Sequence, residues 1–184
     1  EGISIGLSYF KERGFNEQVI KEFRLGYSLE QKNAFTEWAL KNGYKKEFLE
    51  STGLSFFKEN YYFDRFAARV MFPILSISGQ VVGFGARTLS DDKKTAKYLN
   101  SPESLVYNKS KVVYGLFHAK NEIIKQQKKC FLVEGYMDVI SLFMTGIKNV
   151  VSSSGTSLTE DQIRQIHRFA DDITILYDGD LAGI

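Results

Sequence analysis

CFLVEG at residues 130–135 and DITILYDGD at residues 172–180 decide the fold of this chain. In each run an apolar stretch typical of a buried strand ends abruptly in a carboxylate beside a glycine. Glu134 ends the first run, and Asp178 and Asp180 end the second. Because ligands of open α/β sheets collect at the carboxyl ends of the strands, we expect these three acids to meet at one sheet edge.

The chemistry of this acidic edge suits a hard divalent cation. Mg²⁺ in proteins takes one or two carboxylates, several waters and the phosphates of a substrate. We therefore interpret Glu134, Asp178 and Asp180 as a candidate metal-dependent phosphoryl-transfer site. Asp-Gly is also a common turn, so acids that merely face water remain the alternative. Asp138, four residues after Glu134, fits either a favourable contact with a helix dipole or the same metal site.

Residues 113–184 alternate between helix and strand patterns. The expected helices are 113–127, 137–146 and 159–169, and the expected strands are 130–135, 149–154 and 172–180. Strands joined by helical crossovers predict a parallel sheet with right-handed connections. Thr159 and Gln162 are spaced as a capping box for the last helix. Cys130 is expected to be a small buried hydrophobe in its strand.

Residues 1–112 predict a different architecture. Up to about residue 56 the pattern is helical, with Asn16 as a helix cap and Trp38 expected in the core. Residues 70–88, VMFPILSISGQVVGFGART, predict a β-hairpin that turns at Ser78 and Gly79. The predicted fold is an α+β part, helices plus a β-hairpin sheet, over residues 1–112, followed by an α/β part with a parallel sheet over residues 113–184.

Charge is distributed unevenly along the chain. Residues 1–64 carry a net charge of −1, residues 65–128 carry +7 and residues 129–184 carry −4. A basic block followed by an acidic one fits an enzyme that holds a polyanion against bound cations, and a solvated charged surface fits about as well. No run approaches the roughly 20 apolar residues of a membrane span. Cys130 is the only cysteine, which excludes an intrachain disulfide and fits a reducing compartment.

Several motifs together carry a family resemblance. EGYMD at 134–138 with DGD at 178–180 and Ala182-Gly183 resembles the Toprim domain shared by topoisomerases and primases. The upstream runs RFAARVMFPI, GQVVGFGART, KYLNSPES and NKSKVVYGL make the chain similar to bacterial DnaG-type DNA primases. Ala86 stands where the family has a second glycine, a change that matters only if this residue needs a positive φ.

The resemblance implies roles for particular residues. Glu134, Asp178 and Asp180 would be catalytic and hold Mg²⁺ or Mn²⁺, with Asp138 less surely among the ligands. Basic family positions imply contacts with nucleic acid or nucleotides, and here they are Arg87, Lys97, Lys109, Arg65 and Arg69. Residues 1–112 would be the basic, nucleic-acid-binding subdomain, and residues 113–184 an incomplete Toprim subdomain.

The implied activity is the synthesis of short RNA primers from ribonucleoside triphosphates on a single-stranded DNA template. The replicative helicase is the implied partner, through a missing C-terminal domain, and zinc is expected only in an upstream domain absent from this chain. We expect a cytoplasmic enzyme, nucleoid-associated during replication, and a fragment that is inactive alone. The alternative is a Toprim-family nuclease or a non-catalytic nucleic-acid-binding module.

Overall fold

The computed structural model describes residues 2–92, 94–154 and 157–179. The chain forms two compact units, one of residues 1–73 and 82–108 and the other of residues 74–81 and 109–184. The units therefore change over after Asn108, four residues before the boundary expected from the sequence. The second unit also contains the tip of the hairpin. Among helices of the described residues, none combines the length and apolar character needed to cross a membrane.

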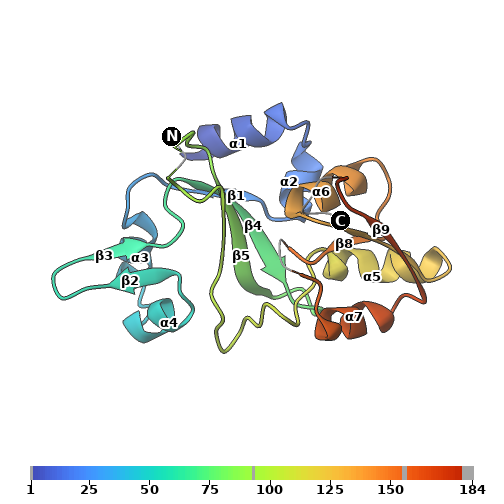
Figure 1. Ribbon diagram of the computed structural model, residues 1–184. Coiled ribbons are helices and arrows are strands. Elements are labelled where there is room, and N and C mark those ends of the chain that lie inside the picture. Colours follow the sequence, from blue (N-terminus) through green and yellow to red (C-terminus); the bar gives the residue numbers. More distant parts are fainter. Residues whose placement is uncertain (1, 93, 155–156, 180–184) are drawn as a thin grey trace. The chain divides into compact units, whose positions relative to one another are not determined.

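The first unit is a four-stranded sheet with helices and a separate two-stranded hairpin (Figure 1). Its helices are α1 (Gly2–Glu12), α2 (Glu17–Glu22), α3 (Ala34–Lys41) and α4 (Lys46–Ser51). The sheet order is β1 (Gly26–Ser28), β4 (Arg69–Leu75), β5 (Val81–Thr88) and β6 (Tyr98–Asn100). The small hairpin pairs β2 (Ser55–Phe57) with β3 (Tyr62–Asp64). The tips of β4 and β5 belong to the second unit.

Local signals explain several of these elements. Gly14, with φ of +80°, follows the end of α1, and the Asn16 side chain accepts a hydrogen bond from the Val19 N–H at 2.9 Å to begin α2. Helix α1 packs on β1, and a Cβ at Gly6 would lie 2.6 Å from the Tyr27 Cβ. A larger residue at position 6 would therefore push the helix off the strand.

The hairpin of β4 and β5 confirms the prediction for residues 70–88. Gly79 has a φ of +87°, and its N–H donates to the Ser76 carbonyl at 2.9 Å. Ala86 lies fully buried in β5 and is not among the residues with positive φ. The departure from the family glycine therefore brings no backbone strain.

The prediction that Trp38 is a core residue is wrong. Its side chain is 56% exposed, and its ring centroid lies 6.0 Å from that of Tyr44. Helix α3 buries Thr36 and Ala39 instead. Helical spacing indicated the helix correctly, but small residues, and not the large ring of Trp38, make its contact with the core.

The sequence also missed β1, β2, β3 and β6, each three residues long. A two-residue period cannot be recognised in so short a run, and tertiary pairing decides these strands. Helix α3 starts at Ala34, later than the polar run before it suggested. Its first turn is fixed by Asp64 from β3, whose carboxylate accepts from the Phe35 and Thr36 N–H groups at 2.8 and 2.9 Å.

The second unit confirms the predicted helix–strand alternation and parallel sheet. In chain order it contains α5 (Leu116–Lys125), β7 (Lys129–Val133), α6 (Tyr136–Met144), β8 (Val150–Ser152), α7 (Glu160–His167) and β9 (Asp172–Leu176). The strand order is β8-β7-β9, with both pairings parallel. These elements form the yellow-to-red part of the chain in Figure 1.

The core of this unit joins the sheet to α5 and α7. Cys130, Leu132, Ile123, Val151 and Ile166 are buried in one apolar cluster. Burial raises the pKa of the Cys130 thiol to about 12, as expected for a small hydrophobe in a strand.

The capping box that begins α7 is confirmed in both directions. The Gln162 N–H donates to the Thr159 hydroxyl at 3.2 Å, and the Thr159 N–H donates to the Gln162 Oε1 at 3.1 Å. Gln162 is fully buried, and its Nε2 also donates to the Val112 carbonyl at 3.0 Å. The cap therefore ties the start of the helix to the segment that precedes α5.

Candidate functional site

Glu134 and Asp178 meet at one edge of the parallel sheet. The register pairs Val133 of β7 with Leu176 of β9, so the residues after both strands leave the sheet at the same level. The Asp178 N–H donates to Glu134 Oε1 at 2.9 Å. The structure thus confirms that these two acids lie together at the carboxyl ends of neighbouring strands.

The strand order marks this edge as the place where ligands bind in open α/β sheets. Strand β7 lies between the other two strands. The chain passes from β7 to its neighbour β8 and then crosses over to β9, the neighbour on the opposite flank of β7. Such a reversal of direction is the topological switch point at which ligands bind in open α/β sheets. The two acids lie where β7 and β9 end, which is this point.

Ser152 supports the backbone of Glu134 from the other neighbouring strand. It is the last residue of β8 and fully buried. Its hydroxyl donates to the Glu134 carbonyl at 2.7 Å and accepts from the Ser154 N–H at 2.8 Å. The sequence signal for this role is no more than a run of hydroxyls directly after an apolar strand.

The structure does not show Asp138 or Asp180 as part of this acidic pair. Asp138 is exposed in the first turn of α6, and its Oδ2 accepts from the Gly135 N–H at 2.9 Å. It therefore caps the N-terminus of α6, and its role as a metal ligand stays a prediction. Asp180 lies outside the described residues. Among the residues that are described, no three Asp, Glu, His or Cys side chains converge as a metal-binding group.

The Glu134–Asp178 pair fits a hard divalent cation. Glu134 is half-buried and Asp178 exposed, and within the described ranges neither forms an ion pair with Lys or Arg. Their negative charge is therefore not balanced by the chain itself. In proteins, Mg²⁺ is typically bound by one or two carboxylates and keeps several water ligands.

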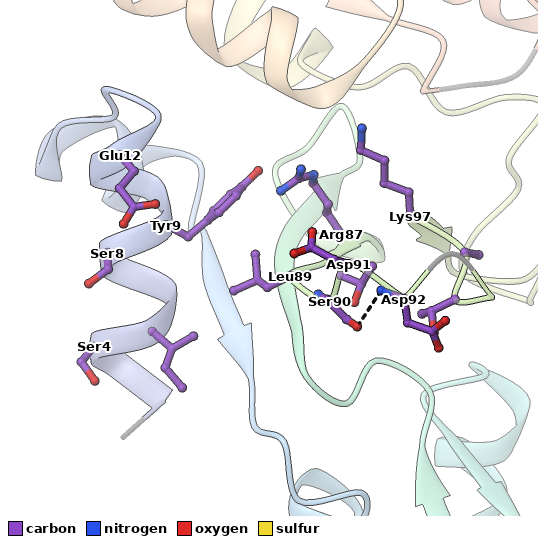
Figure 2. A pocket seen from close by; sticks show the side chains of 14 residues that line it. Ser4, Ser8, Tyr9, Glu12, Arg87, Leu89, Ser90, Asp91, Asp92 and Lys97 are labelled. Atoms are coloured by element: carbon purple, nitrogen blue, oxygen red, sulfur yellow. Dashed lines mark hydrogen bonds between the residues drawn. The ribbon is translucent and has the colours of Figure 1, made fainter.

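Arg87 and Lys97 lie together on a groove of the first unit. Both residues and Tyr9 of α1 line a groove of about 970 Å³, and Figure 2 shows the Arg87 side chain between Tyr9 and Lys97. The Thr88 N–H donates to the Lys97 carbonyl at 3.0 Å, so β5 and the start of β6 hold the two cations on adjacent strands. Asp91 and Asp92 also line the groove, which is therefore mixed in charge.

Arg65 and Arg69 hold the segment that carries Lys97. Arg69 is buried, and its Nη1 donates to the Ala96 carbonyl at 3.0 Å. The Nε and Nη2 of Arg65 both donate to the Asn100 carbonyl at 3.3 Å. Burial lowers the pKa of both guanidinium groups. In this structure both side chains hold backbone carbonyl groups in place, and their contact with nucleic acid stays a prediction.

Lys109, the remaining basic candidate, belongs to the second unit. Its side chain is half-buried, and its backbone carbonyl accepts from the buried Gln162 Nε2 at 3.2 Å. Four of the five predicted basic residues therefore fall into two pairs: Arg87 and Lys97 line one groove, and Arg65 and Arg69 line another.

Comparison with known proteins agrees with this architecture. Residues 3–120 match the family described as DNA primase catalytic core, N-terminal domain, and residues 131–184 match a Toprim-like family. The DNA primase of Clostridium acetobutylicum is 43% identical over 176 residues, which are 95% of this chain and 29% of that protein. The chain thus spans less than a third of the length of this curated relative.

Solved structures are similar over nearly the whole chain. The RNA polymerase domain of Mycobacterium tuberculosis primase DnaG matches with a TM-score of 0.90 and 34% identity, covering 99% of this chain and 62% of that one. A DnaG primase catalytic domain bound to single-stranded DNA matches with a TM-score of 0.87 and 35% identity, covering 100% of this chain and 59% of that one.

The acidic edge and the strand order define the second unit as a Toprim-type α/β domain, a class that implies the use of a divalent metal ion. With the matching N-terminal unit, the assignment narrows further. The chain belongs to the DNA primase family and corresponds to part of its catalytic core.

Proposed function

We propose that this chain supplies part of the catalytic core of an enzyme that synthesises short RNA primers on single-stranded DNA during replication. The observation that carries the proposal is the pairing of Glu134 and Asp178 at the switch point of a Toprim-type sheet. The substrates would be ribonucleoside triphosphates and the growing RNA primer. Such a role on chromosomal DNA would place the enzyme in the cytoplasm, with the replicative helicase as the partner of the whole protein.

Glu134 and Asp178 would hold Mg²⁺ or Mn²⁺, with Asp180 as the expected third ligand. A bound divalent cation supplies Lewis-acid stabilisation of phosphate charge and activation of an attacking hydroxyl. The chain's own contribution is orientation. The Asp178 N–H fixes one oxygen of the Glu134 carboxylate, and the Ser152 hydroxyl fixes the Glu134 backbone, so neither must be ordered when ligands arrive.

Arg87 and Lys97 would contact phosphates of the template, primer or nucleotide. Within the described residues neither cation forms an ion pair, so their charge is available to a polyanion. The exposed Tyr98 neighbours Lys97 in sequence, and aromatic rings beside cations are typical of single-strand binding. The DNA-bound DnaG catalytic domain supports the same substrate class.

The experiment that tests the proposal uses the full-length parent protein. It is incubated with single-stranded DNA, labelled ribonucleotides and Mg²⁺ or Mn²⁺, beside the variants Glu134→Gln and Glu160→Gln. Glu160 is an exposed acid of α7 that pairs with Arg164 and serves as the matched control. We expect short RNA from the parent and from Glu160→Gln, and none from Glu134→Gln.

Other products would redirect the assignment. Shortened DNA in place of new RNA would identify a Toprim nuclease, because the same metal chemistry then serves hydrolysis. DNA binding without either product would leave a nucleic-acid-binding module. RNA synthesis that is unchanged by Glu134→Gln would refute the role given to the acidic pair.

A further inference from the structure

We infer that Tyr9 is a positioning residue that holds the Arg87 guanidinium in the groove for a nucleic-acid phosphate. The inference rests on the proposed function, and it assigns a role to a residue of α1. Tyr9 comes from α1 and Arg87 from β5, so the contact joins a helix to the sheet within the first unit (Figure 2).

The geometry is that of a cation–π contact. The Cζ of Arg87 lies 5.1 Å from the centroid of the Tyr9 ring, and the Cζ of Arg13 lies 5.6 Å from it. Both distances fall within the roughly 6 Å over which a guanidinium is attracted to an aromatic ring. One ring thus contacts two cations, and of these Arg87 lines the groove.

The burial of Tyr9 indicates that the ring, not the hydroxyl, serves this purpose. The side chain is 8% exposed, and within the described part of the chain its buried hydroxyl has no hydrogen-bond partner. Buried tyrosine hydroxyls usually find a partner, because leaving one unpaired is costly. The hydroxyl therefore forms no hydrogen bond that would hold Arg87, whereas the aromatic ring contacts the guanidinium.

Ordering Arg87 matters because its side chain is long and half-buried. An arginine that is free in solution loses rotamer freedom when it binds a phosphate, and a side chain already held loses less. No carboxylate within the described residues holds Arg87 by an ion pair. An aromatic support orders the guanidinium without neutralising its charge, so the full charge stays available to a phosphate.

The test is a double-mutant cycle on binding to a fluorescently labelled single-stranded oligothymidylate, measured by anisotropy over a range of salt concentrations. We expect Tyr9→Phe to bind like the unaltered chain and Tyr9→Leu to bind about two- to fivefold more weakly, the range typical of a partly exposed cation–π contact. Arg87→Ala is expected to bind more weakly and to lower the salt slope by about 0.7, one phosphate contact on a single strand.

The double variant decides whether Tyr9 acts through Arg87. If it does, Tyr9→Leu adds nothing in the Arg87→Ala background, since the supported group is already gone. A full additional loss in that background would overturn the inference, as would equal losses in Tyr9→Phe and Tyr9→Leu. Phe10→Leu is the matched control, because Phe10 is an adjacent buried ring of α1 and no guanidinium of the described residues lies over it. A loss equal to that of Tyr9→Leu would also overturn the inference.

The same data separate this inference from the proposed function. Salt-insensitive binding, or Arg87→Ala binding as tightly as the unaltered chain, would refute the proposed nucleic-acid contact itself. Weaker binding by Arg87→Ala with no effect of Tyr9→Leu would refute only the positioning role of Tyr9. Circular dichroism at the assay temperature confirms that each variant is folded before its binding is compared.

Discussion

Replacing Ser152 by alanine tests how the acidic edge is held together. The hydroxyl is fully buried and makes two hydrogen bonds, to the Glu134 carbonyl at 2.7 Å and from the Ser154 N–H at 2.8 Å. Alanine has nearly the same volume, so the change removes the bonds and leaves almost no cavity. Each bond contributes about 1 kcal/mol, and the two backbone groups remain without these partners.

We therefore expect Ser152→Ala to lower the free energy of unfolding by about 2 kcal/mol, within a range of about 1 to 3. For a chain of this size that corresponds to a fall in Tm of about 4 to 8 °C. Urea unfolding followed by far-UV circular dichroism measures the loss. Hydrogen exchange at the Ser154 amide locates it, because that N–H loses its acceptor.

Ser157→Ala is the control, because Ser157 is an exposed serine between β8 and α7. Its effect should stay within about 0.5 kcal/mol, as is usual for surface substitutions. If Ser152→Ala also stays below about 0.5 kcal/mol and the Ser154 amide exchanges at its former rate, the reasoning fails. The Glu134 backbone would then be fixed by β7 alone.

Three further predictions follow from burial and capping. Thr159→Ala should destabilise the chain by about 1 kcal/mol through loss of the acceptor for the Gln162 N–H, whereas Thr159→Ser should not; equal losses in thermal unfolding would argue against the cap. Trp38→Ala should cost well below the roughly 3–5 kcal/mol of a core aromatic, because Trp38 is 56% exposed; a core-sized loss in urea unfolding would contradict the structure. Because burial raises the pKa of Cys130 from 9.0 to about 12, the folded state holds its proton more tightly than the unfolded one. The free energy of unfolding should therefore fall as pH rises from about 9 to about 12, and this fall should be smaller in Cys130→Ala. Identical pH profiles of the two proteins would refute the raised pKa of Cys130.

Local patterns predicted the second unit well because its signals are strong and short in range. Short apolar runs, such as residues 130–133, alternate with amphipathic helices, and Thr159 with Gln162 marks a helix start in the sequence itself. The candidate acids were also visible, since a carboxylate beside a glycine at the end of an apolar run depends on neighbouring residues alone.

Other features could not be predicted because their partners are distant in sequence. Asp64 caps α3 from 28 and 29 residues away, and Arg69 reaches the Ala96 carbonyl across 27 residues. Trp38 was misplaced for the same reason. Helical spacing shows that residues share a face, but which face meets the core depends on what the rest of the chain brings to it.

The sequence by itself determined the elements of the parallel sheet, the acids at their ends and the basic block upstream, because periodicity, capping and charge are local properties. Only the tertiary structure decided the β8-β7-β9 order, the register that brings Asp178 within 2.9 Å of Glu134, and the support of Arg87 by Tyr9. These depend on pairing and packing between segments dozens of residues apart, where many arrangements satisfy the local pattern and burial of a common core selects one.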